Sequence, residues 1–157
     1  MKKQFIFSIL CGVLLLLASC QDSDSIGDYQ SIPQVYESCP GGCGEKLSCE
    51  GQLVSVWGYL DQHNIFDNAD GEHGDQRFLI AQQLDSQGFA QGKRIEVYPP
   101  QGGDNAPLFE ALSAVDASQR ILITGLAGGF DAPTNLDCQK MITLDIEGES
   151  SVKLEQE

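Results

Sequence analysis

Three cysteines fall within twelve residues of one another, and a fourth lies far downstream. Residues 38–49 read SCPGGCGEKLSC, which brings Cys39, Cys43 and Cys49 close together, whereas Cys138 follows about 90 residues later. Four thiols can hold a metal ion, perform thiol–disulfide exchange or pair as structural disulfides. Which of these they do depends on the redox state of the compartment, so the signals that set the compartment come first.

The first twenty residues indicate export. Lys2 and Lys3 precede an uncharged apolar run over residues 5–17. As a helix that run would reach only about 20 Å, short of the ~30 Å hydrocarbon core of a bilayer. This order is typical of a secretory signal peptide. The run ends in a motif that resembles the lipobox of bacterial lipoproteins, Leu17-Ala18-Ser19-Cys20.

The lipobox resemblance implies that residues 1–19 are removed and that Cys20 carries a diacylglyceryl group and an amide-linked chain such as palmitate. Two or more acyl chains make membrane attachment stable. We therefore expect a lipid-anchored protein of the cell envelope. Gln21 is similar to outer-membrane sorting signals of enterobacterial lipoproteins, and Asp22 and Asp24 resemble surface-export signals of Bacteroidetes lipoproteins. The outer membrane is favoured over the inner one, and its periplasmic and surface faces both stay open.

An oxidising envelope favours disulfides, because an even number of cysteines in a small exported domain is typical of a disulfide framework. Four cysteines allow three pairings. The turn-forming Pro-Gly-Gly insert between Cys39 and Cys43 favours a bridge between these two, which leaves Cys49 with Cys138. A bridge from Cys43 or Cys39 to Cys138 is the alternative.

A metal-binding or thiol-redox site is the other chemistry open to the cysteines. The spacing of Cys39 and Cys43 is similar to the CxxxC of periplasmic copper-delivery proteins, but the chain lacks the βαβ pattern of their thioredoxin-like fold. Structural zinc sites use closely spaced cysteine pairs, and Cys49 and Cys138 are not such a pair. We therefore predict structural disulfides, with no metal site and no cofactor.

Composition divides the chain into segments. Without the signal peptide, seven basic residues face 23 acidic ones, a net charge of −16. Residues 20–38 are polar and acidic, which predicts a flexible tether, and residues 39–48 form a cysteine-rich arm. Residues 49–148 are long enough for one small domain. We expect residues 149–157 to form a short extension or a frayed acidic tail.

Apolar residues in the domain recur mostly with a period of two, the pattern of half-buried strands. Val54, Val56 and Leu60 share one parity with Gly58, where the strand must bend or bulge. Strands are predicted in five segments, which are residues 52–61, 77–82, 94–99, 120–129 and 141–148.

One segment changes period. Pro107 suits the first turn of a helix, and Leu108, Leu112 and Val115 recur at i, i+4 and i+7, which predicts a helix of about ten residues. The order of three strands, one helix and two strands resembles the OB-fold, a five-stranded Greek-key barrel. The resemblance covers roughly residues 51–148. It implies a mainly β fold with its helix between strands three and four.

OB-folds bind oligonucleotides, oligosaccharides or proteins on a face of the barrel, so outward aromatic side chains are candidates for ligand contact. Strand parity points Trp57, Tyr59 and Tyr98 outward, and Phe66 lies in the first long loop. Such rings stack on bases or sugars, but they also pack beneath loops in small domains. These four residues are the predicted ligand face, with packing under loops or against the arm as the alternative.

Charge and motifs narrow the function. Single-strand binders need a basic groove along the phosphates, and basic residues here are few and scattered, so nucleic acid is disfavoured against an envelope protein or glycan. No nucleophile-elbow, zinc-protease, phosphate-loop or dinucleotide motif occurs, which predicts a non-catalytic protein. His63 and His73 are expected to be solvated, and the acidic stretch between them lacks the ligand spacing of a calcium loop.

The predicted function is therefore a lipid-anchored, non-catalytic binding or interaction module. A metal-binding or thiol-redox envelope protein is the first alternative. An oligonucleotide- or oligosaccharide-binding OB domain is the second.

Overall fold

Seven strands and two short helices build the part of the chain that the computed structural model describes, which is residues 28–68, 76–133 and 137–155. The barrel strands are β2 (Leu53–Phe66), β3 (Arg77–Leu84), β4 (Ala90–Tyr98), β5 (Arg120–Ala132) and β6 (Gln139–Asp145). The remaining elements are β1 (Gln30–Ser31), α1 (Ile32–Ser38), α2 (Ala106–Ser113), the 3-10 turn η2 (Glu149–Ser151) and β7 (Val152–Leu154).

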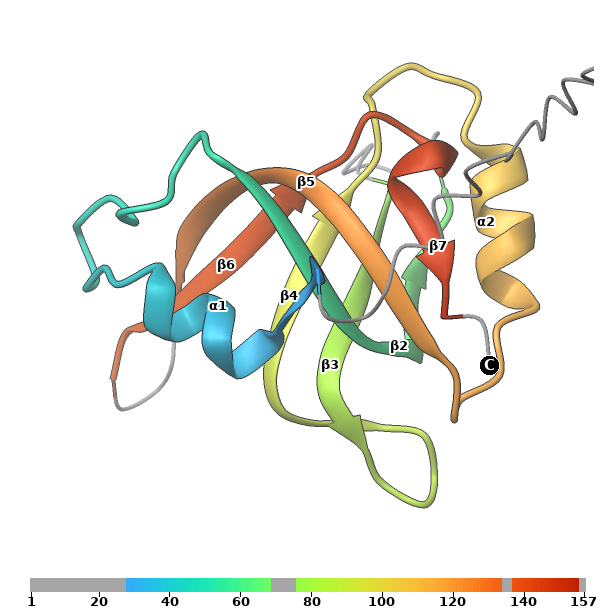
Figure 1. The fold of residues 1–157 in the computed structure, drawn as a ribbon, viewed down its shortest axis with the longest axis horizontal. Coiled ribbons are helices and arrows are strands. Elements are labelled where there is room, and N and C mark those ends of the chain that lie inside the picture. Colours follow the sequence, from blue (N-terminus) through green and yellow to red (C-terminus); the bar gives the residue numbers. More distant parts are fainter. Residues whose placement is uncertain (1–27, 69–75, 134–136, 156–157) are drawn as a thin grey trace, which may run out of the picture.

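The barrel closes because β2 pairs with a different strand along each half. Its first half, from Leu53 to Tyr59, runs antiparallel to β5, and its second half, from Tyr59 to Phe66, runs antiparallel to β3. Around the ring the order is β2, β3, β4, β6 and β5, with β4 and β6 as the parallel pair (Figure 1). With α2 between the third and fourth barrel strands, this is the OB-fold, and the predicted fold class is confirmed.

Alternation along β2 explains why this sequence curves into a barrel. Val56 and Leu60 are buried inside, and the alternating Ser55, Trp57 and Tyr59 are partly exposed. Gly58 belongs to the inward row, where a Cβ would lie 2.9 Å from Ile32 Cδ1 and 3.1 Å from Ala81 O, so glycine lets the strand pass close to both α1 and β3. A register shift between Leu60 and Ile65 then interrupts the pairing of β2 with β3.

The interior is filled almost entirely by branched aliphatic side chains from the inward rows, as the sequence predicts. At about 1.5–3 kcal/mol for each large side chain removed from water, this packing is the main force that holds the ring together. The largest fully buried side chains of the barrel strands are Val56, Leu60, Phe78, Ile80, Ile95, Ile121, Ile123, Ile142 and Leu144.

The described fold begins earlier than the predicted tether allows. Gln30 and Ser31 pair in parallel with β2, and Gln34 Oε1 accepts hydrogen bonds from the Ser31 N–H and hydroxyl at 2.8 Å each, which organises the first turn of α1. Ile32 and Val35 then enter the core with 1% and 0% exposure. Residues 30–38 are therefore part of the domain, and the prediction that they belong to a flexible tether was wrong.

The C-terminal prediction needs a similar correction. The expected tail instead forms η2 and β7, and β7 pairs antiparallel with Ile121 to Ile123 of β5. Val152 packs against the core from this added strand. The short extension was one of the two expected outcomes, and the frayed tail is ruled out for residues 149–154.

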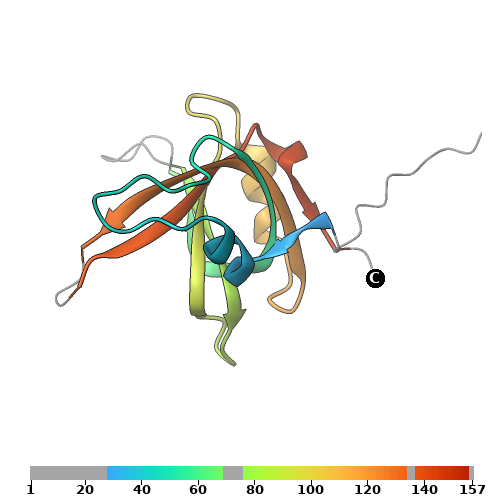
Figure 2. The same ribbon diagram turned by 60° about the vertical axis from the view of Figure 1, so that its left-hand side comes forward.

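The two helices cover opposite ends of the barrel (Figures 1 and 2). α2 is the predicted helix, shortened to eight residues, and it buries Leu108, Phe109 and Leu112. Val115 is also buried, although it lies just beyond the end of the helix. Within the described ranges, no helix has the length and apolar character needed to cross a bilayer.

The cysteine-rich arm leads from α1 back to β2 over the barrel. Leu47 is buried against Gly129 of β5, where a Cβ would lie 2.5 Å from Leu47 Cδ1. The residues between the arm and β2 are also hydrogen-bonded to β5, because Gly51 N–H donates to Ala127 O at 2.7 Å and Ala127 N–H donates to Gln52 O at 2.8 Å. The arm is thus packed against β5 and fixed to the barrel.

Candidate functional site

Two of the predicted ligand-face residues, Trp57 and Tyr59, lie side by side on the outer surface of β2. Their rings meet edge to face with centroids 6.3 Å apart. Arg120 is the cross-strand partner of Tyr59 on β5, and its guanidinium carbon lies 5.1 Å from the centroid of the Trp57 ring. Glu155 holds that guanidinium through a 2.7 Å ion pair to Nε. The cationic group is therefore fixed over an aromatic surface.

A groove of about 460 Å³ opens beside Tyr59. One wall is the turn between β3 and β4, and the other is the turn that precedes β5. Tyr59 is the aromatic side chain among the lining residues, and the rest of the lining is mostly small, amide or hydroxyl-bearing. The lining residues are Tyr59, Gln83, Leu84, Asp85, Ser86, Gly88, Ala117 and Ser118.

The carboxylates at the groove are bound within their own turns. Asp85 accepts hydrogen bonds from the backbone N–H groups of Phe89 at 3.0 Å and Gln87 at 2.9 Å, and these bonds hold its pKa below the ordinary value. On the opposite wall, Asp116 accepts from the hydroxyl and the N–H of Ser118, which lowers its pKa in the same way. Both groups therefore stay negatively charged while they order the walls.

The turn between β3 and β4 has a second support. Gly88 adopts a φ of +84°, a left-handed conformation that favours glycine. His63 of β2 stacks on Phe89 with ring centroids 4.1 Å apart, and its Nε2 lies 3.3 Å from Gln87 O. The sequence predicts His63 to be a solvated loop residue; it is exposed, as expected, but it lies in β2 and stacks against this wall of the groove. His73 lies outside the described residues.

The other two predicted ligand-face residues form a separate group. The Arg77 guanidinium carbon lies 4.3 Å from the Phe66 ring centroid, and Arg77 Nε is 3.9 Å from Glu96 Oε2. Tyr98 donates its hydroxyl hydrogen to the same Glu96 oxygen. The structure therefore divides the four aromatic residues into two pairs on different parts of the barrel. A ligand role for either pair stays a prediction.

The disulfides differ from the favoured pairing. Cys39 is bonded to Cys49, and Cys43 is bonded to Cys138. Cys39 directly follows α1, and the bond from Ser48 N–H to Pro40 O at 3.0 Å folds the arm back so that its two ends meet. Cys43 is left at the far end of that loop, facing the connection between β5 and β6. The pairing of Cys43 with Cys138 was among the alternatives, whereas Cys39–Cys43 with Cys49–Cys138 was wrong.

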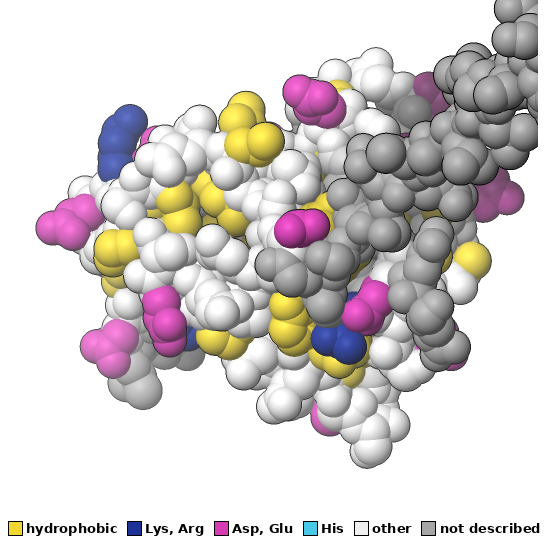
Figure 3. Space-filling view, in the orientation of Figure 1, with side chains coloured by type: hydrophobic (Ala, Val, Ile, Leu, Met, Phe, Trp, Pro, Cys, Tyr) yellow, Lys and Arg dark blue, Asp and Glu magenta, His cyan; other side chains and the backbone are white. Residues whose placement is uncertain are grey.

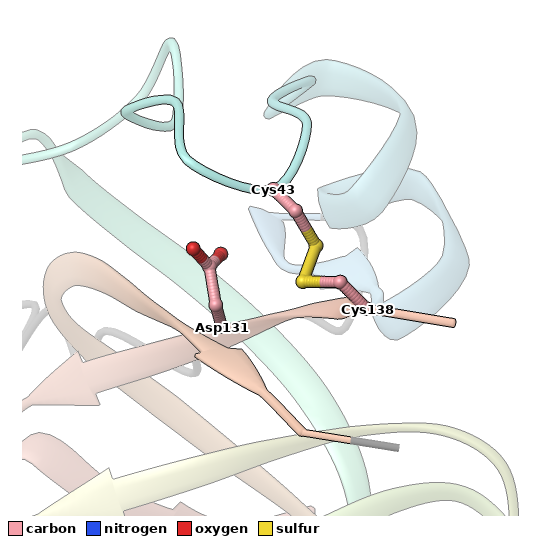
Figure 4. Close-up of side chains that lie close together, drawn as sticks. All are labelled: Cys43, Asp131 and Cys138. Carbon is pink, nitrogen blue, oxygen red and sulfur yellow. A yellow bond between two sulfur atoms is a disulfide. The ribbon is translucent and has the colours of Figure 1, made fainter. Parts of the chain in front are cut away.

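The second bridge has an acidic neighbour, Asp131 of β5 (Figure 4). Its carboxylate accepts a hydrogen bond from Gly44 N–H at 2.8 Å and pairs with Lys140 Nζ at 3.0 Å, and these contacts hold the pKa of Asp131 below its ordinary value. Sequence reasoning missed both Asp131 and Arg120, because only the register of β5 places them beside their partners. The predicted lipidation site, Cys20, lies outside the described residues.

The sequence matches no known family profile, and no curated protein matches it.

Several solved structures are similar in part. OBody AM3L09 bound to hen egg-white lysozyme is 17% identical, with 68% of this chain and 83% of that chain covered and a TM-score of 0.40. A small single-stranded DNA-binding protein from Streptomyces coelicolor is 14% identical, with 59% and 86% covered and a TM-score of 0.39. Aspartyl tRNA synthetase from Entamoeba histolytica is 11% identical, with 81% of this chain but 21% of the synthetase covered and a TM-score of 0.43. Likenesses this distant carry no argument about ligands, and the fold rests on strand order and pairing.

Proposed function

We propose that this chain is a lipid-anchored protein of the cell envelope, attached to the outer membrane through Cys20, whose OB-fold domain is a non-catalytic binding module. The motif Leu17-Ala18-Ser19-Cys20 behind an apolar run supports the anchor. Two disulfides support an oxidising compartment.

The observation that carries the binding role is the groove beside Tyr59. Its volume of about 460 Å³ lies within the range of small-ligand sites, ~300–1,000 Å³. The Tyr59 ring offers an apolar face on which a sugar ring can stack, and Gln83 and Ser86 offer amide and hydroxyl groups for the hydroxyls of the sugar. This combination favours an uncharged envelope glycan as the ligand.

Electrostatics disfavours the polyanionic alternative. Asp85 lines the groove as a carboxylate, Asp116 directly precedes the lining residue Ala117, and the chain without its signal peptide carries a charge of −16. The face in Figure 3 has scattered acidic side chains and few basic ones, without a continuous basic track among the described residues. Oligonucleotide binding depends on such a track for most of its affinity.

A glycan array probed with a soluble form that starts at residue 21, which retains every described residue, tests the binding role. We expect neutral oligosaccharides to bind. Tyr59→Ala should weaken that binding at least about fivefold, because a stacked ring contributes ~1–3 kcal/mol. Phe66→Ala is the matched control, since Phe66 belongs to the other aromatic pair, and it should bind as well as the unmodified chain.

Other outcomes separate the candidates. If a single-stranded oligonucleotide binds and its affinity falls steeply with salt, the ligand is a nucleic acid and not a glycan. If the chain captures an envelope protein and Tyr59→Ala abolishes that capture, the groove is still the binding site but its ligand is a protein. Glycan binding that survives Tyr59→Ala would contradict the site itself.

The anchor is tested separately. Labelled palmitate should be incorporated into the full chain and should be absent from a Cys20→Ala variant. Palmitate label that persists in Cys20→Ala would contradict lipidation at this residue. Recovery of an unlabelled, freely soluble mature chain would contradict the anchor.

A further inference from the structure

The corner formed by Cys43, Cys138 and Asp131 brings together donor atoms suited to a metal ion. Among the described residues, the two Sγ atoms and a carboxylate oxygen of Asp131 all lie within 4.8 Å of one another (Figure 4). We propose that, when a dithiol reductant opens the Cys43–Cys138 bridge, this corner binds one Zn²⁺ ion through the two thiolates and Asp131. The site is separate from the groove and does not depend on the proposed function.

Exposure makes this bridge the one that opens first. Cys43 and Cys138 are both exposed, whereas Cys39 and Cys49 are only 3% and 5% exposed. Reduction needs an incoming thiolate to reach a sulfur atom, so a buried bridge reacts slowly. Mild treatment should therefore produce a form in which Cys39–Cys49 is intact.

The balance of the reduction is simple. A thiolate of the dithiol attacks Sγ of one cysteine, the Sγ–Sγ bond breaks, and its electron pair leaves on the other sulfur. The second thiol of the reductant then displaces the first cysteine and closes a cyclic disulfide. The protein gains two electrons and two protons, and Zn²⁺ binding releases both thiol protons.

The remaining contacts keep the three ligands together after the bridge opens. The Cys39–Cys49 disulfide closes the base of the loop that carries Cys43, and the bond from Gly44 N–H to Asp131 Oδ2 ties its tip to β5. Cys138 directly precedes β6, which pairs with β5 through Asp131 and Lys140. Zn²⁺ would therefore find its ligands ordered in advance.

The carboxylate has the capacity to act as a ligand. Gly44 N–H and Lys140 Nζ each use one acceptor position on a different oxygen of Asp131, and each carboxylate oxygen has two such positions. Two thiolates and one carboxylate carry three negative charges, which Zn²⁺ and the Lys140 ammonium neutralise. Three protein ligands with water as the fourth form a tetrahedral zinc site that is open on one side.

Zinc titration of the chain that starts at residue 21 tests the proposal. An immobilised dithiol reduces the protein and is then removed, and alkylation with mass analysis identifies the reduced bridge. Native mass spectrometry should show one Zn²⁺ per chain after reduction and none before. Cobalt(II) substituted for zinc should give a sulfur-to-metal charge-transfer band, which requires thiolate coordination.

Three variants test the ligand assignment. Cys43→Ser with Cys138→Ser should abolish binding. Asp131→Asn should weaken it at least about tenfold, because a neutral amide replaces a charged ligand. Asp145→Asn removes an exposed carboxylate at the other end of β6 and should leave the affinity unchanged.

Several results would overturn the proposal. They are the absence of bound metal in the reduced chain, binding that persists in the double serine variant, and an unchanged affinity in Asp131→Asn. Loss of the β-sheet circular dichroism spectrum on mild reduction would also overturn it, because the ligands would no longer be held by the fold.

Discussion

The phenol of Tyr36 joins α1 to Ile142 at the start of the parallel ladder between β4 and β6. It accepts a hydrogen bond from Ile142 N–H at 3.3 Å and donates to Arg94 O at 2.8 Å. Ile95 and Ile142 are paired at the adjacent position, so the phenol continues the ladder by one step. A side chain from the segment before the barrel thus supplies a link between two of its strands.

Tyr36→Phe should lower the free energy of unfolding by about 1–3 kcal/mol, because it leaves Arg94 O and Ile142 N–H without this partner while the ring still packs. Urea denaturation measures the loss. Tyr29→Phe is the matched control, since Tyr29 lies outside the ladder, and it should have little effect. Equal losses in the two variants would contradict the role of the link.

Alkaline pH should destabilise the native chain more than the Tyr36→Phe variant. Burial raises the pKa of the Tyr36 phenol above its ordinary value of 10.0. Above that value an unfolded tyrosine loses its proton while the folded one keeps it, so the folded state binds more protons and stability falls as pH rises. Below it the contribution is fully present. The difference in urea midpoint between the native chain and the Tyr36→Phe variant should therefore be smaller at about pH 11 than at about pH 8. A constant difference would refute the assignment.

Gly125→Ala should destabilise the barrel by about 1–3 kcal/mol. A Cβ at this position of β5 would lie 2.8 Å from the carbonyl oxygen of Asp145, a backbone atom that moves only with its strand. Gly103→Ala is the control, because a Cβ there would meet its nearest neighbours at ordinary distances of 3.6 Å or more. Thermal melting of both variants gives the comparison. A Gly125→Ala protein as stable as Gly103→Ala would show that β5 and β6 separate easily.

Removing each disulfide should have unequal effects. Cys43→Ala with Cys138→Ala opens a bridge with a sequence separation of 95, and the loop-entropy treatment gives a loss of up to ~4–5 kcal/mol. The Cys39–Cys49 bridge has a sequence separation of 10, and the same treatment gives a loss of stability of ~3 kcal/mol when it is removed. Guanidinium unfolding of the two alanine pairs tests the order, and a larger loss for the short bridge would point to lost packing of its buried sulfurs.

Acidification should loosen the wall of the groove that Asp85 organises. Hydrogen bonds from Phe89 and Gln87 N–H lower the pKa of this carboxylate, so their stabilising effect is present above its ordinary value of 3.8 and is lost as pH falls through the lower folded value. In NMR titrations the amide signals of Phe89 and Gln87 should shift together with a midpoint below 3.8. A midpoint above that value would contradict the assignment.

The barrel was predictable because most of its strands alternate apolar and polar residues, and because the apolar spacing of α2 follows a helical period instead. β1 and α1 were missed because polar residues surround Ile32 and Val35, although the serine and glutamine spaced for a capping box were present as a signal. β7 was missed because three residues are too few to show a period. The disulfide pairing depended on how the arm folds back, which spacing does not determine.

The sequence did not predict that the four aromatic residues form two separate pairs, and the reason is a register shift. Parity correctly placed Trp57 and Tyr59 on one face, since they are two residues apart in a regular strand. Parity along a single strand contains no information on the register shift between Leu60 and Ile65, which carries Phe66 to another part of the barrel. Tyr98 joins Phe66 there through contacts across three strands.

The early start of the fold at Gln30 leaves nine residues, or ten Cα-to-Cα steps, between Cys20 and the first strand. Fully extended, such a connection spans at most about 35 Å. With a lipid on Cys20, the domain would be confined to a shell of that depth above the bilayer. A ligand fixed in the same shell would then meet the domain at an effective concentration on the order of 10 mM, so that even a millimolar affinity would keep the groove occupied.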